Sequence, residues 1–337
     1  MNPSEFASGL LGWYDQHKRD LPWRDIRDPY KIWLSEVILQ QTRVQQGLPY
    51  YLRFVEKYPT VSDLAEASEE EVLRLWQGLG YYSRARNMHA AARTITTELN
   101  GRFPDNFAEI RKLKGVGDYT AAAVASFAFN EKVAVVDGNV YRVLARVFGV
   151  EDDIASPAGK RVFAELAREL LPATRTDAYN PAIMEFGALH CKPANPDCMF
   201  CHFAHTCQAR LTSRQQVLPV KSRKVKIKKR YFHYIVVNQK NKFLMKKRLK
   251  GDVWECLYDF PLLEDEKFIN KGVFLHAMAE KTGALQAELR LLNVSAEVRH
   301  VLTHQRLHVR FYQIETLSES ATQAIQRFFG AKWQNLA

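Results

Sequence analysis

Four cysteines lie within seventeen positions of the sequence, at Cys191, Cys198, Cys201 and Cys207. Thiolates bind soft or borderline metals, so a set of four can hold an iron–sulfur cluster or a structural zinc ion. Zinc ribbons usually pair two tight cysteine knuckles, whereas this set has one, Cys198 to Cys201, flanked by wider gaps. The spacing therefore favours a 4Fe-4S cluster over zinc and makes all four cysteines candidate ligands.

A second chemical candidate is Glu36, in the segment DPYKIWLSEVILQQT, whose Asp28 and following proline are typical of a helix start. Ile32 and Trp33 lie one turn before Glu36, so its helix face is mostly apolar. A carboxyl group on such a face loses solvation, which raises its pKa and lets it carry a proton near neutral pH. A glutamate at the core edge, paired with an arginine such as Arg24, is the alternative that the sequence leaves open.

The segment LKGVGDYTAAAVASFAF has Gly115 and Gly117 before an alanine-rich helix. This pattern indicates the second half of a helix-hairpin-helix, in which N–H groups at the helix start can bind a DNA phosphate. An ordinary glycine-containing turn is the alternative. Further on, the stretch VAVVDGN delivers Asp137 to the start of another helix, where this residue taken singly favours a plain N-cap role.

The elements that must position these residues fall into two predicted domains, as the chain length of 337 residues suggests. Residues 1–209 have helical periodicity and predict an all-α domain. Residues 210–230 are polar, then basic, and predict an interdomain linker. Residues 231–337 predict a small α+β domain. Its expected strands are 231–237, 242–246 and 307–314, and its expected helix is 268–282.

The composition limits location and partners. No apolar run reaches the roughly twenty residues that a membrane span needs, and the start MNPSEF lacks a secretory pattern. A clustered cysteine quartet with one further thiol, Cys256, fits a reducing compartment. We therefore expect a cytoplasmic protein with no membrane partner.

The net charge of +11 is concentrated in one segment. Residues 210–230 contain nine Lys or Arg and no acidic residue, which leaves +2 for the rest of the chain. A linker can carry such charge for solubility alone. Charge by itself therefore does not identify a nucleic-acid-binding protein.

Several motifs together resemble the helix-hairpin-helix DNA glycosylases that carry a C-terminal iron–sulfur loop, and more closely the MutY-like adenine DNA glycosylases. Besides the hairpin and the cysteine loop at 191–207, the motifs that occur in the family's order are LPWR at 21–24, SEVILQQT at 35–42, GLGYYSRARN at 78–87 and VDGNVYR at 136–142. The resemblance implies a monomeric enzyme of base excision repair, associated with the nucleoid when on DNA. Its implied substrate is double-stranded DNA that contains adenine mispaired with 8-oxoguanine or guanine.

The resemblance also implies roles for single residues. Glu36 matches the acid that protonates the extruded adenine, and Asp137 matches the carboxylate that stabilises the oxocarbenium-like sugar, as in other two-carboxylate glycoside chemistry. Tyr119 and Asn139 match residues that line the reaction site. The residues implied to contact DNA in this domain are Arg24 at the adenine pocket, the wedge residues Gln41 and Tyr81, and also Thr42, Leu79, Gly115, Val116 and Gly117.

Tyr119 separates two branches of this superfamily. In bifunctional relatives such as endonuclease III, a lysine at the matching position attacks the sugar carbon and forms a Schiff base. A phenol cannot form an imine, so the resemblance implies a monofunctional glycosylase.

The second domain resembles the MutT/Nudix-like domain of the same family, which reads 8-oxoguanine. The glutamate-rich magnesium motif of nucleotide-hydrolysing relatives does not occur in 231–337, so we expect a binding module. The family's Phe-Ser-His recognition loop aligns with Leu302, Thr303 and His304.

Two other functions compete with this interpretation. A glycosylase of the same fold could act on thymine or an oxidised pyrimidine, with or without lyase activity. A non-catalytic DNA-binding or electron-transfer iron–sulfur protein is disfavoured, because binding alone requires neither Glu36 nor Asp137.

Overall fold

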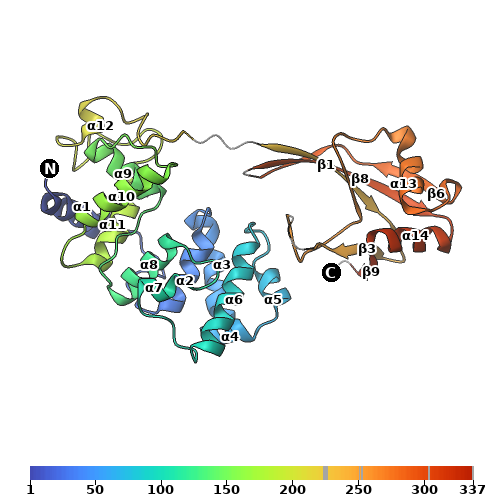
Figure 1. Ribbon diagram of the computed structural model, residues 1–337, viewed down its shortest axis with the longest axis horizontal. Coiled ribbons are helices and arrows are strands. Elements are labelled where there is room, and N and C mark those ends of the chain that lie inside the picture. Colours follow the sequence, from blue (N-terminus) through green and yellow to red (C-terminus); the bar gives the residue numbers. More distant parts are fainter. Residues whose placement is uncertain (223–226, 250, 252, 303, 336–337) are drawn as a thin grey trace. The chain divides into compact units, whose positions relative to one another are not determined.

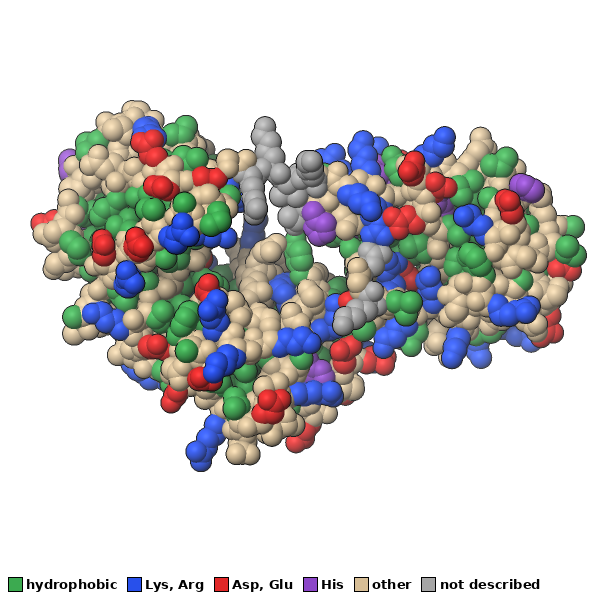
Figure 2. Space-filling view, in the orientation of Figure 1, with side chains coloured by type: hydrophobic (Ala, Val, Ile, Leu, Met, Phe, Trp, Pro, Cys, Tyr) green, Lys and Arg blue, Asp and Glu red, His purple; other side chains and the backbone are tan. Residues whose placement is uncertain are grey.

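The computed structural model describes residues 1–222, 227–249, 251, 253–302 and 304–335. The chain divides into two compact units, Met1–Arg223 and Lys224–Ala337, called here the first and second unit (Figure 1). Within the described residues, every helix is too short or too polar to span a bilayer. Basic and acidic side chains are interspersed on the visible face of each unit in Figure 2.

The first unit is helical throughout, as the periodicity predicts. Its helices are α1 (Pro3–His17), α2 (Pro29–Leu39), α3 (Val44–Lys57), α4 (Val61–Glu66), α5 (Glu69–Leu75), α6 (Ser83–Glu98), α7 (Phe107–Ile110), α8 (Asp118–Phe129), α9 (Gly138–Phe148), α10 (Pro157–Glu169), α11 (Thr176–Leu189) and α12 (Gln208–Leu211).

The first helix packs against the last helices of the same unit (Figure 1). A capping box between Asn2 and Glu5 starts α1 and satisfies two otherwise unpaired backbone N–H groups. Phe6 then enters a core that also contains Phe163 and Phe186, from α10 and α11. In the same part of the unit α9 packs against α11, and both helices carry residues of the pocket described below.

The segment that was predicted to be a linker, 210–230, differs from that prediction at both ends. Leu218 is 2% exposed in the core of the first unit, and its carbonyl accepts a hydrogen bond from Arg146 Nε at 3.1 Å. The Ile154 amide donates to the Val220 carbonyl at 3.1 Å. At the other end, strand β1 already begins at Lys228. Average composition conceals single apolar residues such as Leu218, and a few of them suffice to attach a polar segment to a core.

The second unit is α+β, as predicted. Its strands and helices are β1 (Lys228–Val236), β2 (Asn238–Gln239), β3 (Lys242–Lys247), β4 (Tyr258–Asp259), β5 (Leu262–Asp265), η1 (Lys271–Val273), α13 (Phe274–Thr282), η2 (Gln286–Glu288), β6 (Leu289–Val294), β7 (Val298–Val301), β8 (Gln305–Thr316), α14 (Glu319–Phe329) and β9 (Lys332–Asn335).

Two sheets form this unit, with strand orders β5-β1-β8-β6 and β2-β3-β4; β7 also pairs with β8, and β9 with β3. β1 and β8 are parallel, whereas β7 and β8 form an antiparallel pair. The predicted helix 268–282 is shorter at its start. Asn270 accepts a hydrogen bond from the Gly272 amide at 2.8 Å and initiates a 3₁₀ turn there, and α13 begins only at Phe274.

The attachment of the 211–222 segment predicts unequal effects for two neighbouring residues. Leu218→Ala should destabilise the first unit by about 2–5 kcal/mol, because it leaves a cavity in a packed core. Val217→Ala is the matched control: this side chain is 60% exposed, so a change below about 0.5 kcal/mol is expected. Urea unfolding followed by far-ultraviolet circular dichroism would measure both. Equal effects would contradict the docking of this segment.

Candidate active site

A cavity of about 500 Å³ lies in the first unit, where α2, α8, α9 and α11 contribute side chains to one wall. Its volume is within the range of roughly 300–1,000 Å³ that small-molecule sites occupy. The predicted site residues that line it are Arg24, Glu36, Thr42, Tyr119, Asp137 and Asn139. The fold thus brings together both candidate carboxyl groups, although a hundred residues separate them in the sequence.

Glu36 is held on α2 and is 7% exposed. Asp28 caps this helix, because its Oδ1 accepts hydrogen bonds from the amides of Tyr30 and Lys31 at 3.0 and 3.2 Å. The Tyr119 hydroxyl donates to Glu36 Oε2 at 2.6 Å. Burial raises the pKa of Glu36, and this effect outweighs the hydrogen bond from Tyr119 and the positive charge of Arg24. A raised pKa favours the protonated carboxyl.

Arg24 has another carboxylate partner than the sequence suggested. Its Nη2 lies 3.6 Å from Glu185 Oε2, and Arg19 Nε donates to Glu185 Oε1 at 2.6 Å. Burial alone would raise the pKa of Glu185, but the two arginines hold that pKa below its usual value. Glu185 is therefore the ionised partner of Arg24, and Glu36 is free to be neutral. Sequence reasoning missed Arg19 and Glu185, since nothing in their spacing links them.

Asp137 is the N-cap of α9, as one of its two interpretations predicts, and its side chain also lines the cavity. Its Oδ1 accepts from the amides of Asn139 and Val140, each at 2.8 Å, and its Oδ2 accepts from Asn139 Nδ2 at 2.7 Å. Burial raises the pKa of Asp137, whereas these hydrogen bonds and the charge of Arg142 stabilise its carboxylate form. The two carboxyl groups of the cavity therefore have different environments.

Arg142 links this site to the start of the cysteine loop. Its Nη2 donates to Asn139 Oδ1 at 2.8 Å and to the Gly187 carbonyl at 2.7 Å, and its Nε donates to the Cys191 carbonyl at 2.8 Å. Glycine at 187 permits the close approach of α11 to Asn139, because a Cβ atom at this position would lie 2.7 Å from Asn139 Cβ. The motif VDGNVYR contained Arg142, but its partners at 187 and 191 are visible only in the fold.

The four predicted cysteine ligands line one small pocket together with Arg146 and His190. Arg146 Nη1 donates to the Lys192 carbonyl at 2.7 Å and approaches Cys191 Sγ at 3.4 Å. Among the residues that the structure describes, no three His, Cys, Asp or Glu side chains are arranged to hold a single metal ion. The fold gathers the four thiols around this one pocket.

The predicted hairpin lies between α7 and α8. Gly115 has φ +77°, and a Cβ atom there would lie 2.5 Å from Asn87 Cβ, so this position excludes side chains. Val116 is buried, whereas Gly115 and Gly117 are exposed. Gly117 is the N-cap of α8 and supplies no side-chain cap, so the first N–H groups of α8 are open to an anion.

The predicted wedge residues lie on two loops, 40–42 and 78–81, called here the wedge loops. Gln41 has φ +53° and is exposed, and Tyr81 has φ +49° and is 43% exposed. Leu79 is 6% exposed, so it packs under its loop rather than projecting from it. Left-handed backbone at two non-glycine residues is uncommon and is typical of functional sites.

In the second unit, two of the predicted reading residues, Leu302 and His304, lie where the chain turns from β7 to β8. The Leu302 amide donates to the Gln305 carbonyl at 2.8 Å, and Leu302 packs against an aromatic cluster around Phe232. His304 is exposed, while its carbonyl accepts from the Lys228 amide at 2.9 Å. Thr303 lies outside the described residues.

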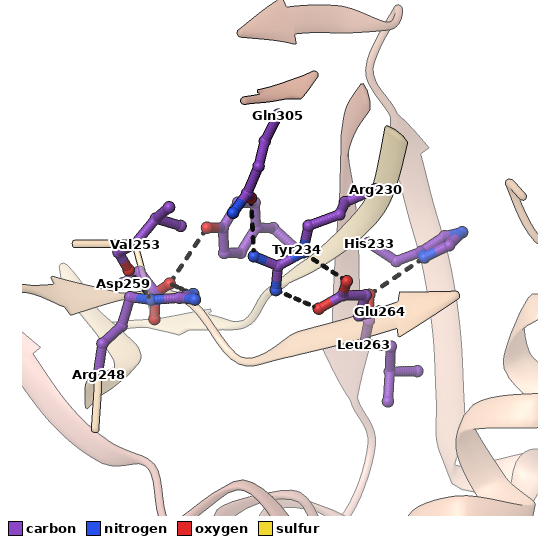
Figure 3. Close-up of polar contacts among 9 residues, drawn as sticks. All are labelled: Arg230, His233, Tyr234, Arg248, Val253, Asp259, Leu263, Glu264 and Gln305. Carbon is purple, nitrogen blue, oxygen red and sulfur yellow. Dashed lines mark hydrogen bonds and ion pairs between the residues drawn. The ribbon is translucent and has the colours of Figure 1, made fainter. Parts of the chain in front are cut away.

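Two buried arginines hold the strands beneath this turn (Figure 3). Arg230 Nε and Nη2 donate to Glu264 at 2.6 and 2.5 Å, and Nη1 donates to Gln305 at 3.1 Å. Arg248 Nη1 donates to Asp259 Oδ2 at 2.7 Å, an oxygen that Tyr234 also contacts. Gln305 begins β8 directly after the turn, so the Arg230 contact fixes one side of it.

Comparisons with known proteins agree with both units. The family described as "HhH-GPD superfamily base excision DNA repair protein" matches residues 34–172, and the NUDIX domain matches residues 233–337. The chain is 33% identical to an adenine DNA glycosylase from Buchnera aphidicola subsp. Baizongia pistaciae, over 90% of this chain and 84% of the relative. It is 45% identical to the adenine DNA glycosylase of Homo sapiens, over 63% of this chain and 41% of that protein.

Two solved structures resemble the first unit. A thermostable thymine-DNA glycosylase has a TM-score of 0.57 at 31% identity, covering 62% of this chain and 97% of that one. Endonuclease III in a non-covalent DNA complex has a TM-score of 0.54 at 24% identity, covering 63% and 98%, which shows a shared fold.

Proposed function

Because the chain belongs to the adenine DNA glycosylase family, we propose that it hydrolyses the N-glycosidic bond of adenine mispaired with 8-oxoguanine or guanine in duplex DNA. It is a DNA N-glycosylase of base excision repair. The observation that carries the proposal is the pair of carboxyl groups, Glu36 and Asp137, in one cavity of the first unit. The relatives that match across both units are adenine glycosylases, which favours adenine over thymine or an oxidised pyrimidine.

Glu36 acts as the general acid. Its raised pKa supports a neutral carboxyl near pH 7, which can give its proton to a ring nitrogen of the extruded adenine. Protonation makes the base a neutral leaving group. Tyr119 holds the carboxyl through its hydroxyl and so fixes the direction from which the proton arrives.

Asp137 stabilises the sugar as the bond to adenine breaks. Three N–H donors from Asn139 and Val140 orient its carboxylate and maintain its negative charge. An oriented anion in a cavity with little water stabilises a developing oxocarbenium ion more than water would. Water then attacks the sugar carbon, and the product is an abasic site.

The enzyme is monofunctional in this proposal. Tyr119 occupies the position where a lysine would attack the sugar, and its hydroxyl is engaged with Glu36. Without an amine at this place no Schiff base forms, so the DNA strand stays intact after the base has left.

The four cysteines hold a 4Fe-4S cluster in this proposal. The sequence spacing supports a cluster, since it has one tight knuckle, Cys198 to Cys201, with wider gaps on either side. A 4Fe-4S cluster takes four thiolates, and all four cysteines line one small pocket. The bound cluster would cross-link the 191–207 loop, which Arg142 and Arg146 attach to α9.

The second unit serves as the module that reads 8-oxoguanine. Main-chain hydrogen bonds hold the backbone of Leu302 and of the exposed His304, and Arg230 holds the neighbouring Gln305. An exposed imidazole on such a backbone can donate to or accept from a base edge. The DNA partner is thus duplex DNA with the mispair, bound by one copy of the chain.

The acid role of Glu36 predicts how the rate depends on pH. The single-turnover rate constant for adenine release should fall as pH rises through the pKa of Glu36, because the protonated fraction is lost. Tyr119→Phe removes a hydrogen bond that stabilises the carboxylate, so the pKa should rise further and the falling limb should move to higher pH. Glu36→Gln should abolish excision without abolishing duplex binding.

The matched control is Tyr179→Phe, which removes a buried hydroxyl that has no hydrogen-bond partner among the described residues. Its pH profile should equal that of the wild type. In every assay the abasic strand should break only after hot alkali. If the rate constant of Tyr119→Phe fell over the same pH range as that of the wild type, Glu36 would not be the titrating group.

The cluster proposal predicts about four irons per chain, with no stoichiometric zinc. Cys198→Ser should lower the iron content, the visible absorption and the thermal midpoint of the first unit. Cys256→Ser is the control, since this cysteine lies in the second unit. Colourless, zinc-loaded and fully active protein would contradict the proposal.

Lesion reading predicts a selective effect at His304. His304→Ala should reduce the preference for adenine opposite 8-oxoguanine over adenine opposite guanine by roughly tenfold, as expected for a lost base contact of ~1–3 kcal/mol. His276→Ala, at an exposed position on α13, should leave that ratio unchanged. A chain that ends at Ser222 should still release adenine with little preference. If the shortened chain kept the full preference for adenine opposite 8-oxoguanine, the second unit would not be the module that reads this lesion.

A further inference from the structure

One arginine, Arg84, connects the two wedge loops. It lies in the first turn of α6. Its Nη1 donates to the carbonyls of Val37, Ile38 and Gln40 at 3.0, 2.9 and 2.6 Å. Its Nη2 donates to the carbonyl of Gly80 at 3.2 Å and contacts that of Leu79 at 3.4 Å.

These contacts occur beside two residues with a strained backbone. Gln41 and Tyr81 are both left-handed, and such residues persist only when their surroundings hold them. Arg84 donates to the carbonyl oxygen immediately before each of them, at Gln40 and at Gly80. The Gly80 carbonyl also accepts from Trp76 Nε1 at 3.0 Å. One guanidinium therefore restrains both left-handed residues at once.

The guanidinium of Arg84 lies at the C-terminal end of α2, where it binds the carbonyls of Val37 and Ile38. The last carbonyls of a helix carry partial negative charge, which favours a cation there. Burial lowers the pKa of Arg84 to about 10, so it remains charged at neutral pH. Among the described residues no carboxylate forms an ion pair with it, and its partners are carbonyl oxygens, a hydroxyl and the rings of Trp76 and Tyr81 at 5.0 and 5.7 Å. The guanidinium therefore joins the two wedge loops through the carbonyls of Gln40 and Gly80.

We propose that Arg84 is a positioning residue that holds Gln41 and Tyr81 together as one preformed wedge. The inference rests on the proposed function, since a wedge matters only if a base is extruded. A wedge that is already ordered offsets the loss of base stacking without first paying the entropy of ordering two loops. Arg84 does not touch the reacting atoms.

The fork of the guanidinium explains why arginine suits this position. Its N–H groups point in fixed directions and reach oxygens on both loops at once. A lysine ammonium is a compact point charge at the end of a flexible stem, so it can satisfy one loop but not both. Arg84→Lys therefore separates the charge of the residue from its geometry.

The test compares excision from two duplexes that differ in how firmly the adenine is held. In one, adenine lies opposite 8-oxoguanine; in the other, it lies opposite a position without a base, where extrusion costs less. Single-turnover rates at saturating enzyme are measured for the full chain and for Arg84→Met, Arg84→Lys and Arg93→Met. Arg93 lies on the same helix and is exposed, and its one hydrogen bond to a described residue is with the Ala65 carbonyl at 3.4 Å.

We expect Arg84→Met to slow excision opposite 8-oxoguanine by about tenfold or more, and opposite the baseless position by no more than about threefold. Arg84→Lys should be intermediate on the first duplex, and Arg93→Met should match the wild type on both. A 2-aminopurine beside the adenine should show less unstacking with Arg84→Met. If Arg84→Met does not fold, Arg84→Lys answers the same question, because it keeps the charge and the stem.

Equal slowing on both duplexes would overturn the inference, because it would mean that Arg84 supports α2 and Glu36 rather than the wedge. An unchanged rate for Arg84→Met would overturn it as well. If the wild-type chain released no adenine from either duplex, the proposed function would fail, and this inference with it.

Discussion

Glu36 loses nearly all contact with water between α2 and α8, and its neighbours must suit a carboxyl group that is easier to bury neutral than charged. A nearby arginine would reverse this preference if it paired with Glu36. The structure avoids that outcome by giving Arg24 a different partner, Glu185, which Arg19 also contacts. The protonation state of Glu36 therefore depends on Glu185 of α11, although no hydrogen bond joins these two described residues.

Asp137 lies in the same cavity but has the opposite requirement. It caps α9, and the partial positive charge of a helix start favours its anionic form. Three donors contact Asp137, whereas one hydroxyl donates to Glu36. Two carboxyl groups with different surroundings can supply an acid and an anion at the same pH, which is the combination that removal of a protonated base requires.

Sequence reasoning identified the features that are local in the chain. The helical periodicity, the Asp28 cap and the glycines of the hairpin follow from spacing within a few residues, and the structure contains them. The missed features all join distant segments. Arg142 reaches Gly187, and Leu218 enters the first core, because of tertiary packing that no local pattern encodes. The left-handed backbone at Gln41 and Tyr81 was also missed, since neither residue type signals it.

The buried arginines of the two units serve different purposes. In the second unit, Arg230 and Arg248 contact the carboxylates of Glu264 and Asp259. In the first unit, the buried Arg142 and Arg146 and the half-buried Arg84 bind mainly backbone carbonyls from separate segments. A carbonyl can fix an arginine without cancelling its charge, whereas an ion pair fixes it and neutralises it. A unit that must approach a polyanion gains from the first arrangement, because the same guanidinium that orders the backbone still contributes positive potential to that unit.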